Sequence, residues 1–458
     1  ASDRHGIFRD VPGLTEASDV EVASTAPDQF VLIGDRIKIG DPDQTISGRH
    51  RYEIAYTLAD GRLLRVEASV EGGRVRLRGA GPLAHLPFVK SALGIADGQI
   101  PVAAADQLIL STWSPPIPSR AFDRLVRSYV KASFGVRTPD QVTISITEEC
   151  PNRCLHCALP DTGRHHRLEP EEVEEVIGQI LDLGTTLVIF DGGEPTTYRE
   201  LPDLVRAVDD RAISTVFTSG AGFTPKLARS LKDAGLYAVN VSLDSAAEAE
   251  HDRMRGRAGA FRDAVRAVEN AIAADLFVDL YAVLRRENVS EIRSFHQLAA
   301  ELNASELTFF EVVPTGRWAE EVGSVLSEEE HAALDEFVSA APPPRTFSVP
   351  AAFREVGCFA GRNWMHITPE GDVYPCACLP RVVGNVRRDP VKKIWQTMAK
   401  LPFQGKKICP ARSFRPKDQH VFIADNRESQ PDQNGTDTDT AGDTDRPHQL
   451  TTPGGKGR

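Results

Sequence analysis

The sequence lacks the long apolar runs with which a chain crosses a membrane. No uninterrupted apolar stretch approaches the roughly 20 residues that a membrane-spanning helix needs, and no charged and then apolar leader opens the chain. These absences argue against membrane-spanning proteins and proteins secreted through a signal peptide. We therefore expect a soluble protein that works in the cytoplasm.

Excess positive charge is missing as well. Lys and Arg number 53 against 65 Asp and Glu, so the formal net charge of the 458 residues is −12. This balance disfavours an extended phosphate-binding surface, and nucleic acid is not an expected partner. A hydrophobic content of 41% in a chain of this length predicts two or three globular domains.

Cysteine is scarce, with seven residues that lie in tight clusters, which favours metal ligation in a reducing compartment over disulfides. Cys150, Cys154 and Cys157 directly follow an alternating strand pattern at 142–147. Three thiolates on one short loop can hold three irons of a four-iron cluster and leave the fourth iron without a protein ligand. Because α/β sheets and barrels carry active sites at the carboxyl ends of strands, we expect the site here.

The spacing of these cysteines, CxxxCxxC, resembles the signature of the radical S-adenosylmethionine (SAM) superfamily. The resemblance implies that they hold a 4Fe-4S cluster whose free iron is chelated by SAM. It further implies that reduction, by a partner such as ferredoxin or flavodoxin, cleaves SAM to a 5′-deoxyadenosyl radical that takes hydrogen from a substrate. The alternative is a structural zinc site, but such a site usually draws four ligands from paired knuckles, and no second knuckle lies nearby.

Helix and strand patterns alternate after this loop. With the strand at 142–147 they make six βα repeats and predict an α/β fold with a parallel sheet covered on one side. Six repeats match the partial (βα)6 barrel of the resembled superfamily. The further strands are expected at 186–191, 215–218, 238–243, 278–283 and 307–312, and the helices at 169–184, 198–209, 225–235, 261–275 and 290–302.

The second of these strands ends in the sequence Asp-Gly-Gly-Glu-Pro, which contains the GGEP motif of the superfamily. Glycines allow a close approach of backbone to a ligand, and a carboxylate can meet an ammonium group. The resemblance implies that Gly192, Gly193 and Glu194 bind the amino group of SAM, that Pro195 belongs to the same site, and that Glu194 acts with the three cysteines in catalysis.

Other strand ends carry segments that are similar to those near SAM in the superfamily. They are the SLD and HDxxRG stretches after the fourth strand, a Thr-Ser-Gly turn after the third and a PxGR segment after the sixth. Polar residues at strand ends can equally be helix caps. The candidate SAM-binding residues in these segments are Ser219, Ser242, Asp244, Arg255 and Pro314.

The remaining cysteines are Cys358, Cys376, Cys378 and Cys409. Their spacing around a Gly resembles the opening of the SPASM and twitch extensions, which hold auxiliary iron-sulfur clusters. The chain has too few cysteines for the second auxiliary cluster of a full SPASM domain, and Arg412 stands where a twitch CxxC pair would end. We expect these cysteines to hold one auxiliary 4Fe-4S cluster. Its fourth ligand is Cys378 or a group from outside the protein, or the fourth iron has no ligand. The alternative is a zinc site or cysteines that hold no cluster.

The predicted domains follow from these patterns. They are an N-terminal antiparallel β-rich domain at 1–118 with a turn at Gly72-Gly73, a linking helix within 119–139, the radical SAM core at 140–341, a small SPASM/twitch-like extension at 342–423, and a disordered polar tail at 424–458.

The leading hypothesis is a radical SAM oxidoreductase or maturase whose auxiliary cluster transfers electrons or binds the substrate, which is a peptide, a tetrapyrrole, another small molecule or a lipid. One alternative is a non-catalytic iron-sulfur or zinc scaffold, against which the complete GGEP motif stands. The other is a radical SAM methyltransferase, which would usually bring a cobalamin domain or an extra catalytic cysteine.

Overall fold

A computed structural model describes residues 43–46, 51–57, 63–104, 106–159, 165–401, 407 and 409–413. The tail predicted at 424–458 lies outside the described residues. None of the helices in the described part is both long and apolar enough to span a bilayer.

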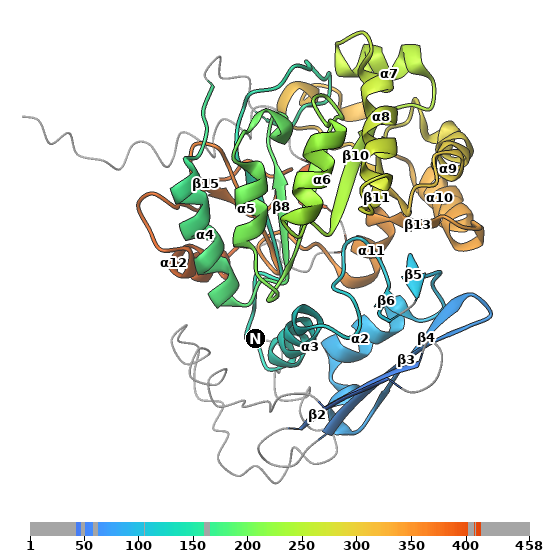
Figure 1. Cartoon of the computed structure of the whole chain (residues 1–458), viewed down its shortest axis with the longest axis vertical. Helices are drawn as coiled ribbons and strands as arrows, with labels where there is room; N and C mark the ends of the chain where they lie inside the picture. The colour runs from blue at the N-terminus through green and yellow to red at the C-terminus, as the bar shows by residue number, and fades with distance from the viewer. Residues whose placement is uncertain are drawn as a thin grey trace, which may run out of the picture.

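A ten-stranded, mostly parallel sheet forms the centre of the molecule (Figure 1). Six consecutive strands of this sheet correspond to the six predicted strands, and each pairs in parallel with the next. Their side chains alternate between the covering helices and the interior, and nearly all are buried. The α/β fold with a mostly parallel sheet is thus confirmed. The strands are β7 (Gln141–Ser145), β8 (Leu187–Asp191), β9 (Ile213–Thr218), β10 (Ala238–Leu243), β11 (Phe277–Leu284) and β12 (Glu306–Glu311).

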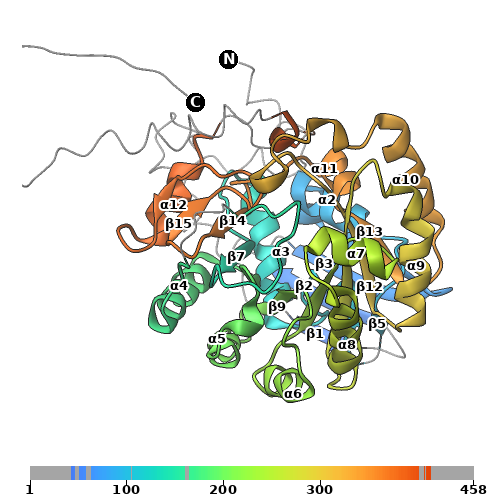
Figure 2. The same ribbon diagram turned by 90° about the horizontal axis from the view of Figure 1, so that it is seen from above.

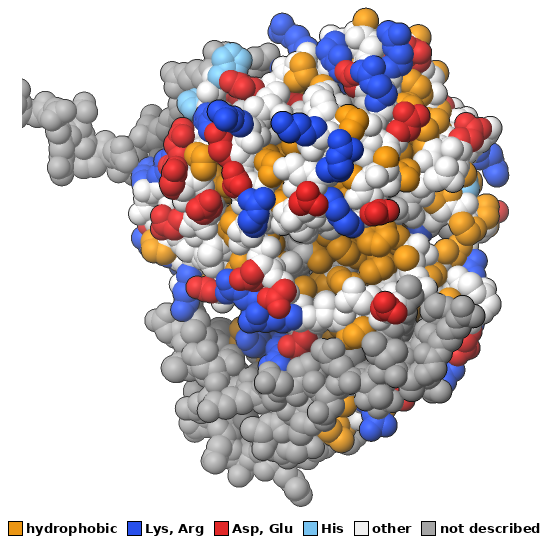
Figure 3. Space-filling view, viewed as in Figure 1, with side chains coloured by type: hydrophobic (Ala, Val, Ile, Leu, Met, Phe, Trp, Pro, Cys, Tyr) orange, Lys and Arg blue, Asp and Glu red, His pale blue; other side chains and the backbone are white. Residues whose placement is uncertain are grey.

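Helices cover the outer side of the curved sheet, as the view in Figure 2 shows. The first of them begins at Pro170 after a capping box of Glu169 and Glu172 and ends at Leu183, where Gly184, with a φ of 109° that favours glycine, caps it. Their outward faces carry Lys and Arg interspersed with Asp and Glu (Figure 3). The helices are α4 (Pro170–Leu183), α5 (Leu201–Ala207), α6 (Pro225–Asp233), α7 (Glu248–Arg255), α8 (Ala260–Ile272) and α9 (Ile292–Glu301).

The sheet continues beyond these six strands at both edges. At one edge, α10 (Glu328–Ala340) leads to β13 (Arg345–Ser348), which pairs in parallel with β12. At the other edge, β14 (Trp364–Ile367) pairs in parallel with β7. The sheet therefore runs into the region assigned to the C-terminal extension, and the domain boundary at 341 and 342 stays a prediction. The remaining elements of this region are α11 (Val349–Val356), β15 (Asp372–Tyr374), β16 (Gly384–Asn385) and α12 (Val391–Met398).

The N-terminal region forms an antiparallel sheet in strand order, and its predicted hairpin turn at Gly72 and Gly73 has φ values of 58° and 75°. Two helices pack on one face of this sheet with their own apolar core. The later helix matches the expected linking helix, whereas the earlier one was not predicted. The elements are β1 (Asp43–Ile46), β2 (Arg51–Thr57), β3 (Leu63–Glu71), β4 (Arg74–Ala80), α2 (Pro87–Ala96), β5 (Ala103–Ala104), β6 (Leu108–Ile109) and α3 (Arg120–Ser133).

The N-terminal domain packs against the amino ends of the barrel strands. Glu306, the first residue of β12, is fully buried and accepts hydrogen bonds from the Ser111 hydroxyl and from the backbone and hydroxyl of Thr112. Arg345, the first residue of β13, pairs with the same carboxylate. Trp113 donates its indole N–H to Asp279 of β11 over 2.9 Å. These contacts attach the N-terminal domain to the first residues of the barrel strands.

Candidate functional site

A cavity of about 980 Å³ runs from the cysteine loop through the barrel to the N-terminal domain, where residues of α2 and α3 line it. This volume is at the upper end of the range of roughly 300–1,000 Å³ found for small-molecule sites, so the cavity can hold a cofactor with part of a substrate. The loop with the first three cysteines, the GGEP turn and Cys378 all contribute to its wall. Aromatic side chains cover much of the remaining wall, among them Trp113, Phe217, Tyr281 and Phe310.

The first three cysteines lie on the loop that follows β7. Cys150 is exposed, Cys154 is buried and Cys157 is partly buried. Although Cys150 is accessible from the cavity, the protein around its thiol removes part of the solvent and raises its pKa to about 11, and the negative charges of Glu194 and the other two thiols add to the shift. Burial and the charge of Cys154 raise the pKa of Cys157. These thiols are close enough to disfavour each other's ionisation, a repulsion that bound iron would relieve.

Glycines fix the path of this loop. A Cβ on Gly193 would lie 2.3 Å from the carbonyl oxygen of Glu149, and a Cβ on Gly256 would lie 2.5 Å from that of Arg153. Gly316, with a φ of 55°, would place a Cβ 2.1 Å from the carbonyl oxygen of Cys157. Glycine is therefore required where each of three other segments touches the backbone of the cysteine loop.

Glu194 is the most enclosed residue of the GGEP motif, with an exposed fraction of 0%. Its carboxylate accepts four hydrogen bonds, from the hydroxyl of Thr218, the backbone and hydroxyl of Ser219 and the backbone of Thr196. The carboxylate thus ties the end of β8 to the end of β9. Direct binding of the SAM ammonium by Glu194 stays a prediction, whereas Gly192 and Gly193 do line the cavity.

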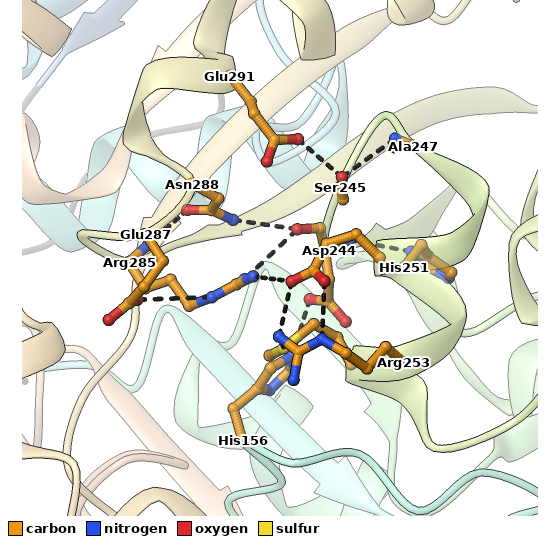
Figure 4. A network of polar contacts seen from close by, with 12 residues as sticks. His156, Asp244, Ser245, Ala247, His251, Arg253, Arg285, Glu287, Asn288 and Glu291 are labelled. Atoms are coloured by element: carbon orange, nitrogen blue, oxygen red, sulfur yellow. Dashed lines mark hydrogen bonds and ion pairs between the residues drawn. The ribbon is translucent and has the colours of Figure 1, made fainter.

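Asp244 follows β10 and is also fully buried (Figure 4). Its carboxylate lies 2.8 Å from Nε2 of His156 in the cysteine loop and 2.7 Å from Nε of Arg255 at the end of α7. Its backbone N–H donates to Nδ1 of His251, and its carbonyl oxygen accepts from the amide of Asn288. Burial opposes ionisation of Asp244, but the charges of Arg255 and His156 outweigh it and hold its pKa well below the usual range.

The other predicted SAM-binding residues lie around the same space. Ser219 and Ser242 line the cavity, and so does Arg255, whose Nη1 lies 3.7 Å from the sulfur of Cys154. Pro195 is buried where it begins the short η3 turn (Pro195–Thr197). Pro314 is buried between two residues that line the cavity. The structure therefore brings all the predicted cofactor-binding residues to the carboxyl ends of the strands.

The four C-terminal cysteines form a second group. Cys358, Cys376 and Cys378 belong to one small apolar cluster. Burial raises the pKa of Cys376 well above its ordinary value, and the charges of the other three thiols add to the shift. Burial and the charge of Cys358 raise the pKa of Cys409 to about 12. The four thiols are therefore close enough to influence one another's ionisation, and Cys378 as the fourth ligand stays a prediction.

Both groups fit iron-sulfur clusters by the chemistry of their donors. Thiolates are the usual protein ligands of such clusters, with three at an open 4Fe-4S site and four at a closed one. Among the described residues, no three His, Cys, Asp or Glu side chains are arranged in metal-binding geometry.

Arg412, at the position of the missing cysteine, donates to the carbonyl oxygen of Leu326 and pairs with Glu311 over 3.3 Å, so it attaches its segment to the barrel.

Sequence reasoning missed a polar cluster in the cavity wall. The Ser145 hydroxyl donates to Asp191 over 2.5 Å and lies 3.4 Å from Nε2 of His366. Burial raises the pKa of Asp191 to about 7 and lowers that of His366 to about 4. Ser145 and Asp191 end two neighbouring strands, so the strand-end rule could have found them. His366 joins them through the pairing of β14 with β7, for which the sequence carries no local signal.

Comparison with known proteins agrees with this geometry. Residues 144–299 match the family model of the Radical SAM superfamily, and residues 358–415 match that of SPASM, an iron-sulfur cluster-binding domain.

Three curated relatives have sequences similar to this chain. An AdoMet-dependent heme synthase of Methanosarcina barkeri is 27% identical over 288 residues, which are 56% of this chain and 82% of that protein. A PqqA peptide cyclase of Bradyrhizobium diazoefficiens is 29% identical over 285 residues, 58% of this chain and 74% of that protein. The mycofactocin maturase MftC of Mycolicibacterium smegmatis is 29% identical over 301 residues, 61% of this chain and 74% of that protein.

Proposed function

Since this chain is a radical SAM enzyme with a SPASM domain, we propose that Cys150, Cys154 and Cys157 hold the cluster at which SAM is reductively cleaved. We further propose that Cys358, Cys376, Cys378 and Cys409 hold one auxiliary 4Fe-4S cluster. The observation that carries the proposal is that the first cysteine loop and Cys378 line the same cavity. A substrate in that cavity has access to both groups of thiols.

When bound, the cluster and SAM supply the electron and the carbon radical that removes a substrate hydrogen. The residues of this chain orient the reactants and exclude water. The main chain of Gly192 and Gly193 faces the cavity beside the cysteine loop, and Ser242 faces it from β10. The aromatic walls keep the space dry, which protects a reactive intermediate from side reactions.

The substrate that these walls favour has a flat apolar part and a hydrogen-bonding group. Tyr281 stacks on Phe310 at 5.9 Å and meets Phe217 edge to face at 4.9 Å, so the wall is built for contact with an unsaturated group. The cluster of Ser145, Asp191 and His366 offers hydrogen-bond donors and acceptors close by. A peptide side chain and a tetrapyrrole both meet this description, in line with the names of the relatives.

We also propose that a ferredoxin or flavodoxin reduces the first cluster from the outside. Leu155 on the cysteine loop is 38% exposed, so the loop reaches the surface. All seven cysteines are free, which suits the reducing cytoplasm that we propose as its compartment.

The experiment is anaerobic reconstitution with iron and sulfide, followed by SAM and dithionite and detection of 5′-deoxyadenosine by mass spectrometry. We expect product from the wild type and none from the variant with Cys150, Cys154 and Cys157 all replaced by Ala. That variant should retain about half of the iron, because the auxiliary cluster remains. A variant with all four C-terminal cysteines replaced serves as the reciprocal control.

Absence of both 5′-deoxyadenosine and SAM binding would favour the scaffold hypothesis. S-adenosylhomocysteine together with a methylated acceptor would favour the methyltransferase hypothesis. Addition of tetrapyrroles or peptides to the same assay, with the rise in 5′-deoxyadenosine as the readout, distinguishes the two classes of substrate.

A further inference from the structure

Arg255 brings a positive charge to one sulfur of the first cysteine loop. It is the last residue of α7 and is buried, and its Nη1 lies 3.7 Å from the sulfur of Cys154. Guanidinium groups stay protonated in proteins, so this charge is permanent. A cation this close to a cluster ligand interacts with whatever charge the cluster carries.

Backbone contacts fix the distance between Arg255 and the loop. The carbonyl oxygen of Arg255 accepts from the N–H of Arg153, and that of Met254 accepts from the N–H of Leu155. Gly256 follows in a left-handed conformation with a φ of 65°, and a Cβ there would strike the carbonyl of Arg153. The end of α7 is therefore held against the residues on both sides of Cys154.

Asp244 fixes the direction of the guanidinium. Its Oδ2 lies 2.7 Å from Nε of Arg255, so the remaining nitrogens point toward the loop. The second oxygen of the carboxylate lies 2.8 Å from Nε2 of His156, the residue before Cys157. The main chain of Asp244 is itself held by His251 and Asn288 (Figure 4). One buried carboxylate thus links Arg255 with the cysteine loop.

We propose that Arg255, oriented by Asp244, stabilises the reduced state of the first cluster and so raises its reduction potential. Reduction adds negative charge to the cluster, and a fixed cation beside a ligand sulfur favours the more negative state. Asp244 contacts Nε of Arg255, whereas Nη1 of Arg255 lies near Cys154, so Asp244 acts as a positioning group. This proposal rests on the proposed function, since it concerns the cluster assigned to Cys150, Cys154 and Cys157.

The test is an anaerobic redox titration of the reconstituted full chain, followed by electron paramagnetic resonance, with iron content measured on the same samples. The cluster under study is identified by the change that SAM causes in its signal. We expect Arg255→Met to retain nearly all of its iron. At a fixed potential, its ratio of reduced to oxidised cluster should fall at least tenfold, which for one electron corresponds to a reduction potential lower by 59 mV. Arg255→Lys keeps the charge and should retain most of the wild-type potential.

Two further variants separate this role from others. Asp244→Asn removes a negative charge, which by itself would raise the potential; if Asp244 orients Arg255, the potential falls instead. Arg253→Met, on the same helix at an exposed position, should leave the potential unchanged. If Arg255→Met loses iron, Arg255→Gln and Arg255→Lys are compared in its place, and equal potentials in these two would overturn the proposal.

A wild-type potential in Arg255→Met with full iron overturns the inference and leaves SAM cleavage intact. A higher potential in Asp244→Asn overturns the orienting role of Asp244. Absence of 5′-deoxyadenosine from the wild type would instead refute the proposed function, so the two failures are distinguishable.

Discussion

Replacement of Gly193 by Ala should damage the cysteine loop, although the change adds only a methyl group. The new Cβ would lie 2.3 Å from the carbonyl oxygen of Glu149 and 2.6 Å from that of Glu148. Both contacts are with backbone, so no side chain can rotate away. Relief needs a shift of the loop by about 1 Å, and overpacking of this kind costs about 1–3 kcal/mol.

The same shift weakens the hydrogen bonds from Gly193 N–H to the carbonyl of Thr147, at 2.6 Å, and from Glu194 N–H to that of Glu149, at 2.7 Å. With about 1 kcal/mol for a lost hydrogen bond, the total is about 2–4 kcal/mol. Since 1 kcal/mol changes the Tm of a domain of 150–250 residues by about 2–4 °C, we expect a fall of at least about 4 °C. The displaced loop should also bind substoichiometric iron.

The assay is thermal unfolding together with iron content after anaerobic reconstitution. Gly178→Ala is the matched control, because a Cβ there, on the helix α4, meets nothing within 4 Å. This control should leave the iron content unchanged and raise stability by about 0.5–1 kcal/mol. A Gly193→Ala protein with the Tm and iron of the wild type would refute the reasoning.

Three further predictions concern buried carboxyl groups. Glu194→Gln places an amide NH₂ group against groups that already donate hydrogen bonds, so the free energy of unfolding should fall by about 1–3 kcal/mol in a denaturant titration. The control, exposed Glu174→Gln, should change stability little. Equal effects of the two substitutions would contradict the hydrogen-bond network around Glu194. Burial raises the pKa of Asp140 to about 7, so the folded state keeps a proton that the unfolded state loses above about pH 4, and stability falls as pH rises from 4 to 7. Asp140→Asn should remove that part of the pH dependence. If stability changes with pH in the same way in the wild type and in Asp140→Asn, the prediction is wrong. Glu306→Ala removes the carboxylate that pairs with buried Arg345 and should cost about 3–5 kcal/mol in the same titration. Exposed Glu301→Ala should cost under about 1 kcal/mol. An equally small cost for Glu306→Ala would show that this carboxylate does not hold the N-terminal domain to the barrel.

The barrel repeats were predictable because their signals are local. Short apolar strands and amphipathic helices alternate along the chain, and the strand expected at 238–243 coincides with β10. The Gly-Gly turn predicted the β3–β4 hairpin for the same reason, since positive φ values at both positions favour glycine.

Long-range pairing was beyond sequence reasoning. Met365 of β14 pairs with Val142 of β7, and no property of either short segment specifies the other. For that reason the C-terminal region was expected as a separate extension, and the cavity cluster that includes His366 was missed. The helix α2 was missed because its sequence, Pro87–Ala96, is short and contains a glycine.

Within the site, motifs identified residues better than roles. The GGEP motif led to Glu194, but its acceptor capacity is used by Thr218 and Ser219, which lie on the next strand. Asp244 and Arg255 pair with each other, which the motifs did not indicate, and their contact with SAM stays a prediction. A motif shows which side chains share a site, whereas their pairing depends on side-chain directions that only a folded structure provides.

The pairing of β14 with β7 has a consequence for electron tunnelling. Tunnelling rates depend steeply on the distance between redox centres, and the strand that leads into the first cysteine loop is hydrogen-bonded to the strand that separates Cys358 from Cys376. Hinge motion of the C-terminal region would have to break this ladder. The distance between the two proposed clusters is therefore set by the sheet and should stay constant through the catalytic cycle.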